Sequence, residues 1–467
     1  MLYILRISGE ITIKSPQVRG SFQRKLAQNL HAALATVPAK ASLKQEGGRL
    51  LLESTHTELA PILTRVFGIQ SVSPIVASCP AELPVIVEKG VALFTPLVQN
   101  RTYAVQCRRS GVHSFSSLDV NQHLGAALRN ESNRADLSNP QVPVGVEVRN
   151  QEAHFFHDSF PGPGGLPLGT AGRATCLISG GYDSAAAAWM LMKRGVELNF
   201  VFCNVASAAY EASVIEVTRL LIERWAYGIS PRLYCIPFFD VIKELRATVE
   251  PRYVQVVLKR LFYRAAEKIA ARTESLALVT GEAIGQVSSQ TLMNLRAIET
   301  ACTRPVLRPL VSFDKHEIIA LCRKIGTASL SGAIDEYCQL VPQKPSTHTP
   351  VQVAQYEEDK MDLSILDTAV EQGIFVELRV APVKAASCWI DTVPENSLLL
   401  DCRTEDEFQT GHMEGAQWCD FYQWMDATET LDPALSYVFY CDQGLQSVLL
   451  AEKMRSKGFS AFAFARK

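Results

Sequence analysis

The hydrophobic positions of the first part of the chain follow two different periods. Short apolar runs at Leu2–Ser8 and Leu50–Glu53 predict strands, whereas Val18–Ala35 has apolar residues at helical spacing. Strict alternation predicts half-buried strands at Thr102–Arg109 and at 142–148, where valine occupies every second position. This part is therefore expected to mix short strands with amphipathic helices.

The pattern changes after a Gly/Pro-rich break at Pro161–Gly169. Four apolar runs then alternate with helical stretches such as Tyr253–Arg272: Ala174–Ser179, Asn199–Val205, Arg232–Phe238 and Leu276–Thr280. Such alternation predicts a doubly wound parallel sheet with helices on both faces. A second break at Val341–Pro350 precedes an acidic helix near Glu357–Gln372. From about residue 386 strands and a helix follow again.

These changes divide the chain into five segments, so the fold class is α/β multidomain. We expect small α/β domains at 1–60 and 61–165, the doubly wound domain at 166–340, a linker with a helix at 341–385, and another small α/β domain at 386–467.

The composition is that of a folded, water-soluble protein. The 467 residues are 47% hydrophobic and 20% charged, and no run of about 18 apolar residues predicts a membrane span. The net charge of −2 divides into +4 for residues 1–165, +1 for 166–384 and −7 for 385–467. The charge therefore leaves a nucleic-acid partner open. Twelve cysteines without a C-x-x-C pair, and no signal peptide, indicate the reducing cytoplasm.

The candidate chemistry begins at Ser179-Gly-Gly-Tyr-Asp-Ser184, between a predicted strand and a predicted helix. Two glycines allow a sharp turn, and the free N–H groups of the helix start favour an anion. Asp183 could hold Mg²⁺ on the phosphates of a nucleotide. The alternative is a tight turn with Ser and Asp caps. The Walker A and Rossmann patterns both fail elsewhere in the chain.

This motif resembles the signature of the PP-loop ATP pyrophosphatases. Two further stretches, 278–290 and Asp335-Glu-Tyr-Cys338, resemble the tRNA 4-thiouridine synthetases, and Arg108–Asp119 is similar to their THUMP domain. The resemblance covers nearly the whole chain. It implies a ferredoxin-like domain at 1–60, THUMP at 61–165, the PP-loop domain at 166–340 and a rhodanese domain at 386–467.

The predicted nucleotide site gathers around this loop. Gly281 follows a predicted parallel strand, at the sheet edge where such folds bind ligands, and Lys259 could neutralise a phosphate. With the residues that match the family's ATP-contacting positions, the predicted ATP-binding set is Leu177, Ile178, Ser179, Gly180, Gly181, Ser184, Lys259, Gly281 and Gln290.

Two cysteines are candidates for sulfur chemistry. Tyr437–Ser447 places Cys441 between a strand and a tight loop, which resembles a rhodanese loop whose backbone N–H groups stabilise a persulfide. Gln446 stands where many rhodaneses carry Arg. Cys338 is assigned by resemblance as a second functional thiol, whereas Cys402 and Cys419 are taken as structural.

RNA contact is expected in the THUMP-like part. Arg108, Arg109 and His113 supply cations and Phe115 an aromatic ring, a set suited to phosphate and RNA shape. The alternative is a surface loop with chance basic residues.

The resemblance implies ATP-dependent formation of 4-thiouridine at position 8 of tRNA, with Cys441, Cys338 and Asp183 catalytic. It also implies Mg²⁺, a cysteine desulfurase as sulfur donor, a thiol reductant and, for thiamine thiazole synthesis, a sulfur-carrier protein. Because the two thiols lie on different domains, the stretch near Val341–Pro350 is a candidate hinge. Alternatives are an amide-forming PP-loop ligase, for which a rhodanese domain has no use, and a tRNA-binding persulfide relay that adenylates nothing.

Overall fold

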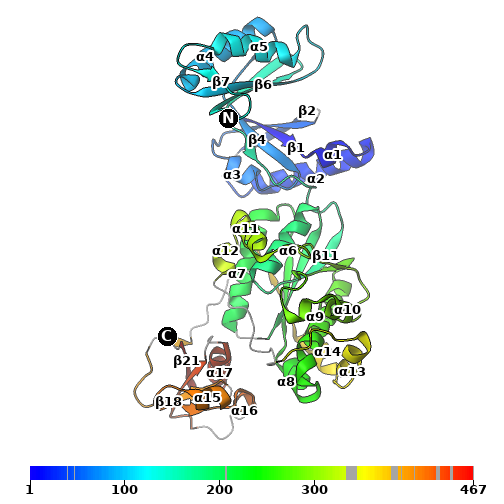
Figure 1. The fold of residues 1–467 in the computed structure, drawn as a ribbon, viewed down its shortest axis with the longest axis vertical. Helices are drawn as coiled ribbons and strands as arrows, with labels where there is room; N and C mark the ends of the chain where they lie inside the picture. The colour runs from blue at the N-terminus through cyan, green and yellow to red at the C-terminus, as the bar shows by residue number, and fades with distance from the viewer. Residues whose placement is uncertain are drawn as a thin grey trace. The chain divides into compact units, whose positions relative to one another are not determined.

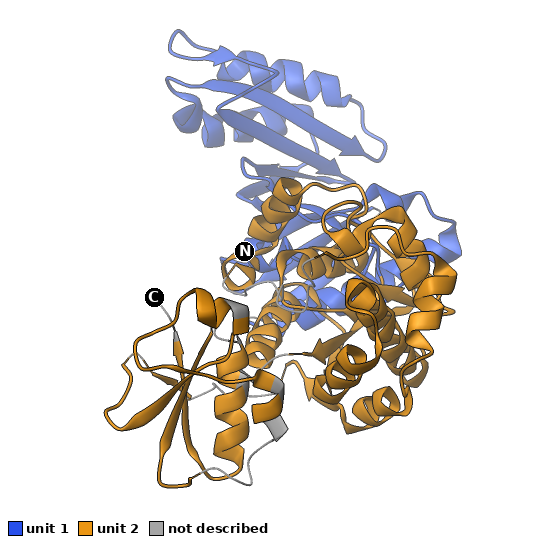
Figure 2. Ribbon diagram, turned by 60° about the horizontal axis from the view of Figure 1, so that its bottom comes forward, with its two compact units in different colours: residues 1–170, 193–195 blue, residues 171–192, 196–467 orange. Residues whose placement is uncertain are grey.

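The computed structural model forms two compact units, residues 1–170 with 193–195 and residues 171–192 with 196–467 (Figure 2). It describes residues 1–38, 40–46, 48–205, 208–332, 344–379, 388–390, 392–403, 405–426, 432–441 and 445–465. Cys338 therefore lies outside the described residues. In the described part of the chain, no helix is long and apolar enough to cross a bilayer.

The first unit contains two sheets (Figure 1). One is antiparallel with strand order β10-β4-β1-β3-β2, and its central strand β1 is almost entirely buried. Its elements are β1 (Leu2–Ile7), α1 (Gly9–Thr12), α2 (Pro16–Leu34), β2 (Ala41–Glu46), β3 (Arg49–Ser54), α3 (Ala60–Leu63), β4 (Ile69–Ile75) and β10 (Phe160–Pro161). Because β4 and β10 complete this sheet, the expected boundary at residue 60 comes too early.

The second sheet of this unit has the order β5-β9-β8-β6-β7. Its core joins Phe94 and Leu124 of two helices to Val144, Val146 and Phe155 of the strands. Its elements are β5 (Ala77–Pro80), α4 (Leu83–Val98), β6 (Thr102–Ser110), α5 (Ser117–Leu128), β7 (Arg134–Ala135), β8 (Val142–Arg149) and β9 (Glu152–Phe156).

The second unit begins with the predicted doubly wound sheet, order β15-β14-β11-β12-β13-β16. Its first five strands in this order pair in parallel, and the prediction is confirmed. The strands are β11 (Arg173–Leu177), β12 (Glu197–Asn204), β13 (Arg232–Pro237), β14 (Ala277–Val279), β15 (Val306–Leu307) and β16 (Ile374–Glu377). The helices are α6 (Tyr182–Lys193), α7 (Ala208–Trp225), α8 (Phe239–Thr248), η1 (Pro251–Tyr253), α9 (Val254–Arg272), η2 (Ser288–Gln290), α10 (Leu292–Glu299), α11 (Lys315–Ile325), α12 (Ala328–Ser331), α13 (Val351–Glu358) and α14 (Ser364–Gln372).

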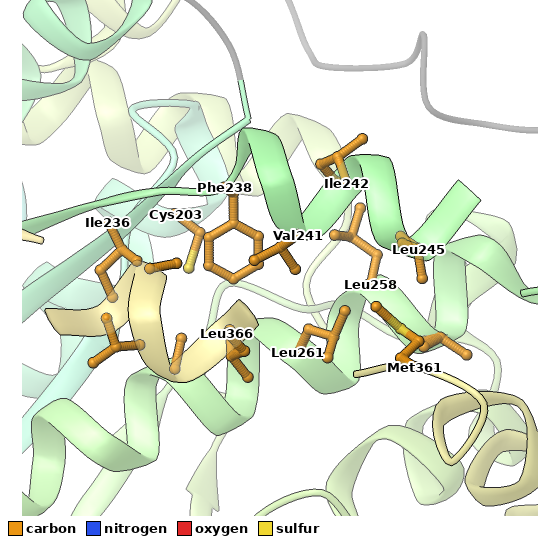
Figure 3. Packing of buried hydrophobic residues seen from close by; sticks show 14 of the residues in the cluster. Cys203, Ile236, Phe238, Val241, Ile242, Leu245, Leu258, Leu261, Met361 and Leu366 are labelled. Atoms are coloured by element: carbon orange, nitrogen blue, oxygen red, sulfur yellow. The ribbon is translucent and has the colours of Figure 1, made fainter. Parts of the chain in front are cut away.

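The expected linker at 341–385 differs from the structure, because its described residues 344–379 belong to this domain. Strand β16 pairs antiparallel with β13 at the sheet edge. Met361 and Leu366 pack with Phe238 and Leu261 in the same buried cluster (Figure 3). In α13, Glu358 forms an ion pair with fully buried Arg260 of α9.

The expected hinge at Val341–Pro350 also differs from the structure, because its described residues are hydrogen-bonded to the doubly wound domain. The Ser346 amide donates to the Arg252 carbonyl (2.8 Å), and the Thr349 amide donates to Asn294 Oδ1 (2.9 Å). Thr349 is fully buried.

The last part of the chain forms a parallel sheet of order β17-β21-β20-β18-β19. Its core cluster contains four cysteines, Cys388, Cys402, Cys419 and Cys441. Its elements are β17 (Trp389–Ile390), β18 (Ser397–Asp401), α15 (Glu405–Thr410), β19 (Gln417–Trp418), α16 (Phe421–Asp426), β20 (Ser436–Cys441), α17 (Leu445–Ser456) and β21 (Ser460–Ala465).

Candidate functional site

The loop between β11 and α6 is held in shape by its own residues. Gly180 has φ +77°, a left-handed conformation that glycine adopts without strain. Ser184 Oγ accepts from the Ser179 amide (3.1 Å) and donates to the Gly181 carbonyl (3.2 Å). The loop therefore presents the N-terminus of α6, with its partial positive charge, in a fixed geometry.

A second loop supports the first from the end of β14. A Cβ on Gly281 would lie 2.6 Å from the Asp183 carbonyl carbon and 2.7 Å from the Ser184 nitrogen. Only glycine permits this approach without displacing backbone atoms. Gly281 thus supports the N-terminus of α6 directly.

Both loops open into a cavity of about 330 Å³. It collects eight of the nine predicted nucleotide contacts, together with Asp183: Leu177, Ile178, Ser179, Gly181, Ser184, Lys259, Gly281 and Gln290. Gly180 shapes the loop but does not line the cavity. Residues far apart in the sequence are therefore brought to one place.

Lys259 supplies positive charge to the cavity from α9. Its Nζ lies 5.8 Å from the centroid of the Phe262 ring. Within the part of the chain that the structure describes, no carboxylate forms an ion pair with it, so its charge is available to an anion in the cavity.

Asp183 is paired with a lysine that sequence reasoning missed. Lys315 Nζ lies 3.0 and 3.2 Å from the two Asp183 carboxylate oxygens, and Gln286 Nε2 donates to one of them (2.8 Å). Lys315 is the first residue of α11, after a capping box in which Asp314 and Glu317 bond to one another's backbone. A lysine at the start of a helix interacts unfavourably with the helix dipole. This unusual position was the only feature of the sequence that could have pointed to a role for Lys315.

The prediction that Asp183 holds Mg²⁺ on the phosphates of ATP stays a prediction. Mg²⁺ prefers several oxygen ligands, and the Asp183 oxygens already accept from Lys315 and Gln286. Among the described residues no group of three or more His, Cys, Asp or Glu is arranged for a metal. We assign no step to a metal ion.

A polar network centred on Glu282 forms part of the cavity wall. Its carboxylate accepts from Tyr263 Oη (2.5 Å), Thr280 Oγ1 (3.0 Å) and Arg308 Nε (3.0 Å). Burial and then the Glu282 charge raise the pKa of Tyr263 well above its ordinary value. Tyr263 is therefore a neutral donor that fixes Glu282, and with it the backbone next to Gly281.

In the last domain, Cys441 ends β20 and is fully buried. Its Sγ contacts Ser447 Oγ (3.7 Å), in the first turn of α17. Residues 442–444 lie outside the described residues, as does Cys338, so the predicted link between the two thiols stays a prediction.

The predicted RNA-contacting residues point to different places. Arg108 is exposed and lines a cavity of the first unit, whereas Arg109 Nη1 donates to the Gly111 carbonyl (2.9 Å) and contacts His113 Nδ1 (3.0 Å). Phe115 is 7% exposed and belongs to the hydrophobic core. A buried ring cannot stack on a base, so the expected role of Phe115 in RNA contact does not fit the structure.

The cavity beside Arg108, about 350 Å³, contains two further arginines that sequence reasoning missed, Arg6 and Arg49. Both bond to Glu147, which also pairs with Arg149. Burial alone would raise the pKa of Glu147, but the arginines outweigh it and lower that pKa. One carboxylate thus faces three arginines, and the cavity keeps an excess of positive charge.

The loop Ser179-Gly-Gly-Tyr-Asp-Ser184, between a parallel strand and a helix N-terminus of a doubly wound sheet, has the arrangement of the PP-loop proteins. The last part of the chain forms a second parallel sheet with Cys441 at the end of a strand, which is the arrangement of a rhodanese-type domain. Family models match in the same order: ThiI ferredoxin-like domain at 2–73, THUMP domain at 80–158, thiamine biosynthesis protein (ThiI) at 169–363 and rhodanese-like domain at 389–465.

Curated relatives match along the whole chain. The tRNA sulfurtransferase of Desulfurococcus amylolyticus is 36% identical, with 99% of this chain and 96% of the relative covered. That of Pseudomonas syringae is 35% identical, with 98% of each covered. A crystal structure of a 4-thiouridine synthetase–RNA complex with bound ATP superposes with a TM-score of 0.69 at 31% identity, over 80% of this chain and 98% of that one. The chain belongs to the tRNA sulfurtransferase (ThiI) family of enzymes.

Proposed function

We propose that the enzyme adenylates a tRNA uridine with ATP and then replaces the activated oxygen by sulfur, giving 4-thiouridine. The observation that carries the proposal is the single cavity that gathers the PP-loop, Lys259, Gly281 and Gln290. The likeness to a 4-thiouridine synthetase with bound ATP supports the same conclusion.

In the first step, uracil O4 attacks the α-phosphorus of ATP, and the bond to pyrophosphate breaks. The N–H groups at the start of α6 and the Lys259 ammonium stabilise the phosphate oxygens. Lys315, held by Asp183 at the same loop, adds a second cation. Activation is needed because a carbonyl oxygen is a poor leaving group, whereas AMP is a good one.

A cysteine desulfurase loads Cys441 with a persulfide. In the second step, its outer sulfur attacks C4, AMP leaves, and the sulfur joins Cys441 to the base. Cys338 then attacks Cys441 Sγ, the bond between Cys441 Sγ and the outer sulfur breaks, and the sulfur stays on the base. A thiol reductant reopens the resulting Cys338–Cys441 disulfide. Since the Cys441 side chain is buried, loading requires that its sulfur become accessible.

The tRNA is bound by the first unit, where Arg6, Arg49 and Arg108 line one basic cavity. A planar guanidinium can donate two hydrogen bonds to one phosphate. Arg108, which is exposed, is placed for this contact, whereas Arg6 and Arg49 already bond to Glu147 and contribute charge. The likeness to the ThiI family also supports a second role, sulfur supply for thiamine thiazole synthesis, in which a sulfur-carrier protein is the acceptor.

The deciding experiment measures pyrophosphate release and the mass of the tRNA product with ATP, tRNA, cysteine and a desulfurase. Cys441→Ala is expected to abolish thiolation while tRNA-dependent pyrophosphate release persists. Asp183→Ala is expected to do the reverse, with persulfide still formed on Cys441. Loss of both activities in Cys441→Ala would contradict the division of labour.

The alternative is a tRNA-binding persulfide relay without adenylation. It predicts no pyrophosphate release under any of these conditions, and it leaves the PP-loop cavity without a purpose.

A further inference from the structure

Three cysteines stand side by side at the carboxyl ends of three neighbouring strands of the last domain. Asp401 of β18 is in register with Trp418 of β19 and with Tyr440 of β20. The next residues continue this register, because the Cys402 amide donates to the Tyr440 carbonyl and the Cys419 amide donates to the Asp401 carbonyl, both at 2.9 Å. Cys402 therefore lies between Cys419 and Cys441.

All three side chains point to the same face of the sheet. They belong to one buried cluster and are at most 1% exposed. Their neighbours Asp401 and Tyr440 point to the other face, where Tyr440 Oη donates to Asp401 Oδ2 (2.7 Å). The Sγ atoms of Cys402 and Cys419 are 3.5 Å apart. We call Cys441, Cys402 and Cys419 the cysteine row.

The spacing of the row suits thiol–disulfide exchange. Neighbouring strands lie about 4.8 Å apart, within the Cα separation of about 4.4–6.8 Å that a disulfide spans. The described residues hold no group of three or more His, Cys, Asp or Glu arranged for a metal, so the row is not explained as a metal site.

We propose that Cys402 and Cys419 reduce the persulfide on Cys441 and thereby release its outer sulfur as sulfide inside the rhodanese domain. This inference rests on the proposed function, which places the persulfide on Cys441. Cys402 acts as a catalytic residue, since its sulfur attacks the reacting atom. The enzyme then has a source of sulfide that does not require Cys338.

The exchange balances in two steps. Cys402 attacks Cys441 Sγ, a Cys402–Cys441 bond forms, the bond between Cys441 Sγ and the outer sulfur breaks, and the Cys402 proton leaves with hydrogen sulfide. Cys419 then attacks Cys402 Sγ, and Cys441 departs as a thiol with the Cys419 proton. The two thiols supply two electrons to the outer sulfur and end as a Cys402–Cys419 disulfide, which the thiol reductant reopens.

The environment of the row lowers the reactivity of Cys402, so the exchange depends on the short distances within the row. Burial, followed by the proximity of Cys419 and Cys441, raises the pKa of Cys402 well above its ordinary value. A protonated, buried thiol is inert toward external reagents. The Cys441 persulfide, one strand away, is the electrophile within its reach.

The test uses the full chain with Cys338→Ser, which removes the predicted competing thiol. It is loaded with cysteine and a cysteine desulfurase, freed of small molecules, and kept without reductant. We expect sulfide release together with a Cys402–Cys419 disulfide in the non-reducing peptide map. Cys402→Ser in this background is expected to retain the persulfide and release only background sulfide. Cys388→Ser, in the same core but outside the row, is the matched control and keeps the release.

A Cys441 persulfide that persists in the Cys338→Ser chain, with Cys402 and Cys419 both still alkylated after unfolding, would overturn the inference and leave the proposed function intact. Failure to load any sulfur onto Cys441 would overturn both. The peptide map of the Cys338→Ser chain decides without a core substitution, so misfolding of a Cys402 variant does not change the outcome.

Discussion

Gly281→Ala tests whether the loop after β14 supports the PP-loop. The new Cβ would lie 2.6 Å from the Asp183 carbonyl carbon, whereas ordinary contact begins at 3.4 Å. The difference, 3.4 − 2.6, requires a displacement of about 0.8 Å in one of two backbone segments. No flexible side chain can absorb it, because the atoms in contact are main-chain atoms of Asp183 and Ser184.

The size of both effects follows from general magnitudes for overpacking and for misplaced reacting groups. Overpacking of this kind costs about 1–3 kcal/mol of folding free energy. A misplacement approaching 1 Å at a reacting centre lowers the rate by about 100-fold. We therefore expect a modest fall in the unfolding temperature, and a loss of tRNA-dependent pyrophosphate release far larger than that fall would suggest.

The matched control is Gly285→Ala in the same loop. Gly285 has φ +76°, and a Cβ added there would have no atom within 4 Å, so alanine introduces strain of about 1–2 kcal/mol without a clash. It is expected to lower stability to a similar extent and to keep pyrophosphate release. Wild-type release in Gly281→Ala, measured by a coupled pyrophosphate assay at saturating ATP, would refute the reasoning.

Three further predictions follow from other contacts. Lys315→Met leaves the Asp183 carboxylate without its cation and is expected to lower pyrophosphate release at least tenfold while persulfide loading of Cys441 is unchanged; equal loss of loading would indicate unfolding instead. Arg108→Gln is expected to weaken tRNA binding and to reduce the slope of the logarithm of the binding constant against the logarithm of the salt concentration by about 1. Phe115→Leu, at a buried ring, is expected to lower thermal stability and leave this slope unchanged. A smaller slope in Phe115→Leu would argue for RNA contact. Glu147→Gln is expected to cost about 3 kcal/mol at neutral pH by leaving buried arginines unpaired. Because the folded pKa of Glu147 lies below its usual 4.5, its stabilisation is present above the unfolded pKa and is lost as the pH falls through the folded value; thermal unfolding near neutral pH and in acid should therefore show a smaller acid loss in Glu147→Gln.

The local parts of the site could be predicted from the sequence. A strand, two glycines, serines and a helix in succession favour a PP-loop. The structure places all of the predicted residues except Gly180 around one cavity. The parallel sheet followed from its apolar runs for the same reason, since each strand and each crossover helix has its own hydrophobic pattern.

Contacts between distant segments could not be predicted in this way. Lys315 reaches Asp183 across 132 positions, and Arg6 reaches Glu147 across 141, without any periodicity that links them. For Phe115 the sequence predicted an RNA contact that the structure does not support. An aromatic residue next to basic residues in a loop has the same sequence pattern whether its ring is buried or exposed.

Strand β16 was missed because its surroundings differ from those of the central strands. It lies at the sheet edge, and three of its four side chains are exposed although its first three residues are apolar. Its short run Ile374-Phe-Val therefore does not match the longer buried runs of the central strands. The buried Arg260–Glu358 ion pair, which holds α13 against α9, could not be predicted either, because in the sequence the two residues resemble ordinary surface charges.

The anchored segment just after that edge strand limits how far the last domain can move from the doubly wound domain. Just beyond β16, Arg379 Nη2 donates to the Ala226 carbonyl (2.7 Å), whereas Cys388 already belongs to the core of the last domain. Nine peptide steps separate these two anchors, and whatever their conformation they span at most about 32 Å. A free segment over 341–385 would allow several times that distance. The short connection thus keeps the last domain at a high effective concentration beside the doubly wound domain of the same chain. Under the proposed function, this favours sulfur delivery within one molecule.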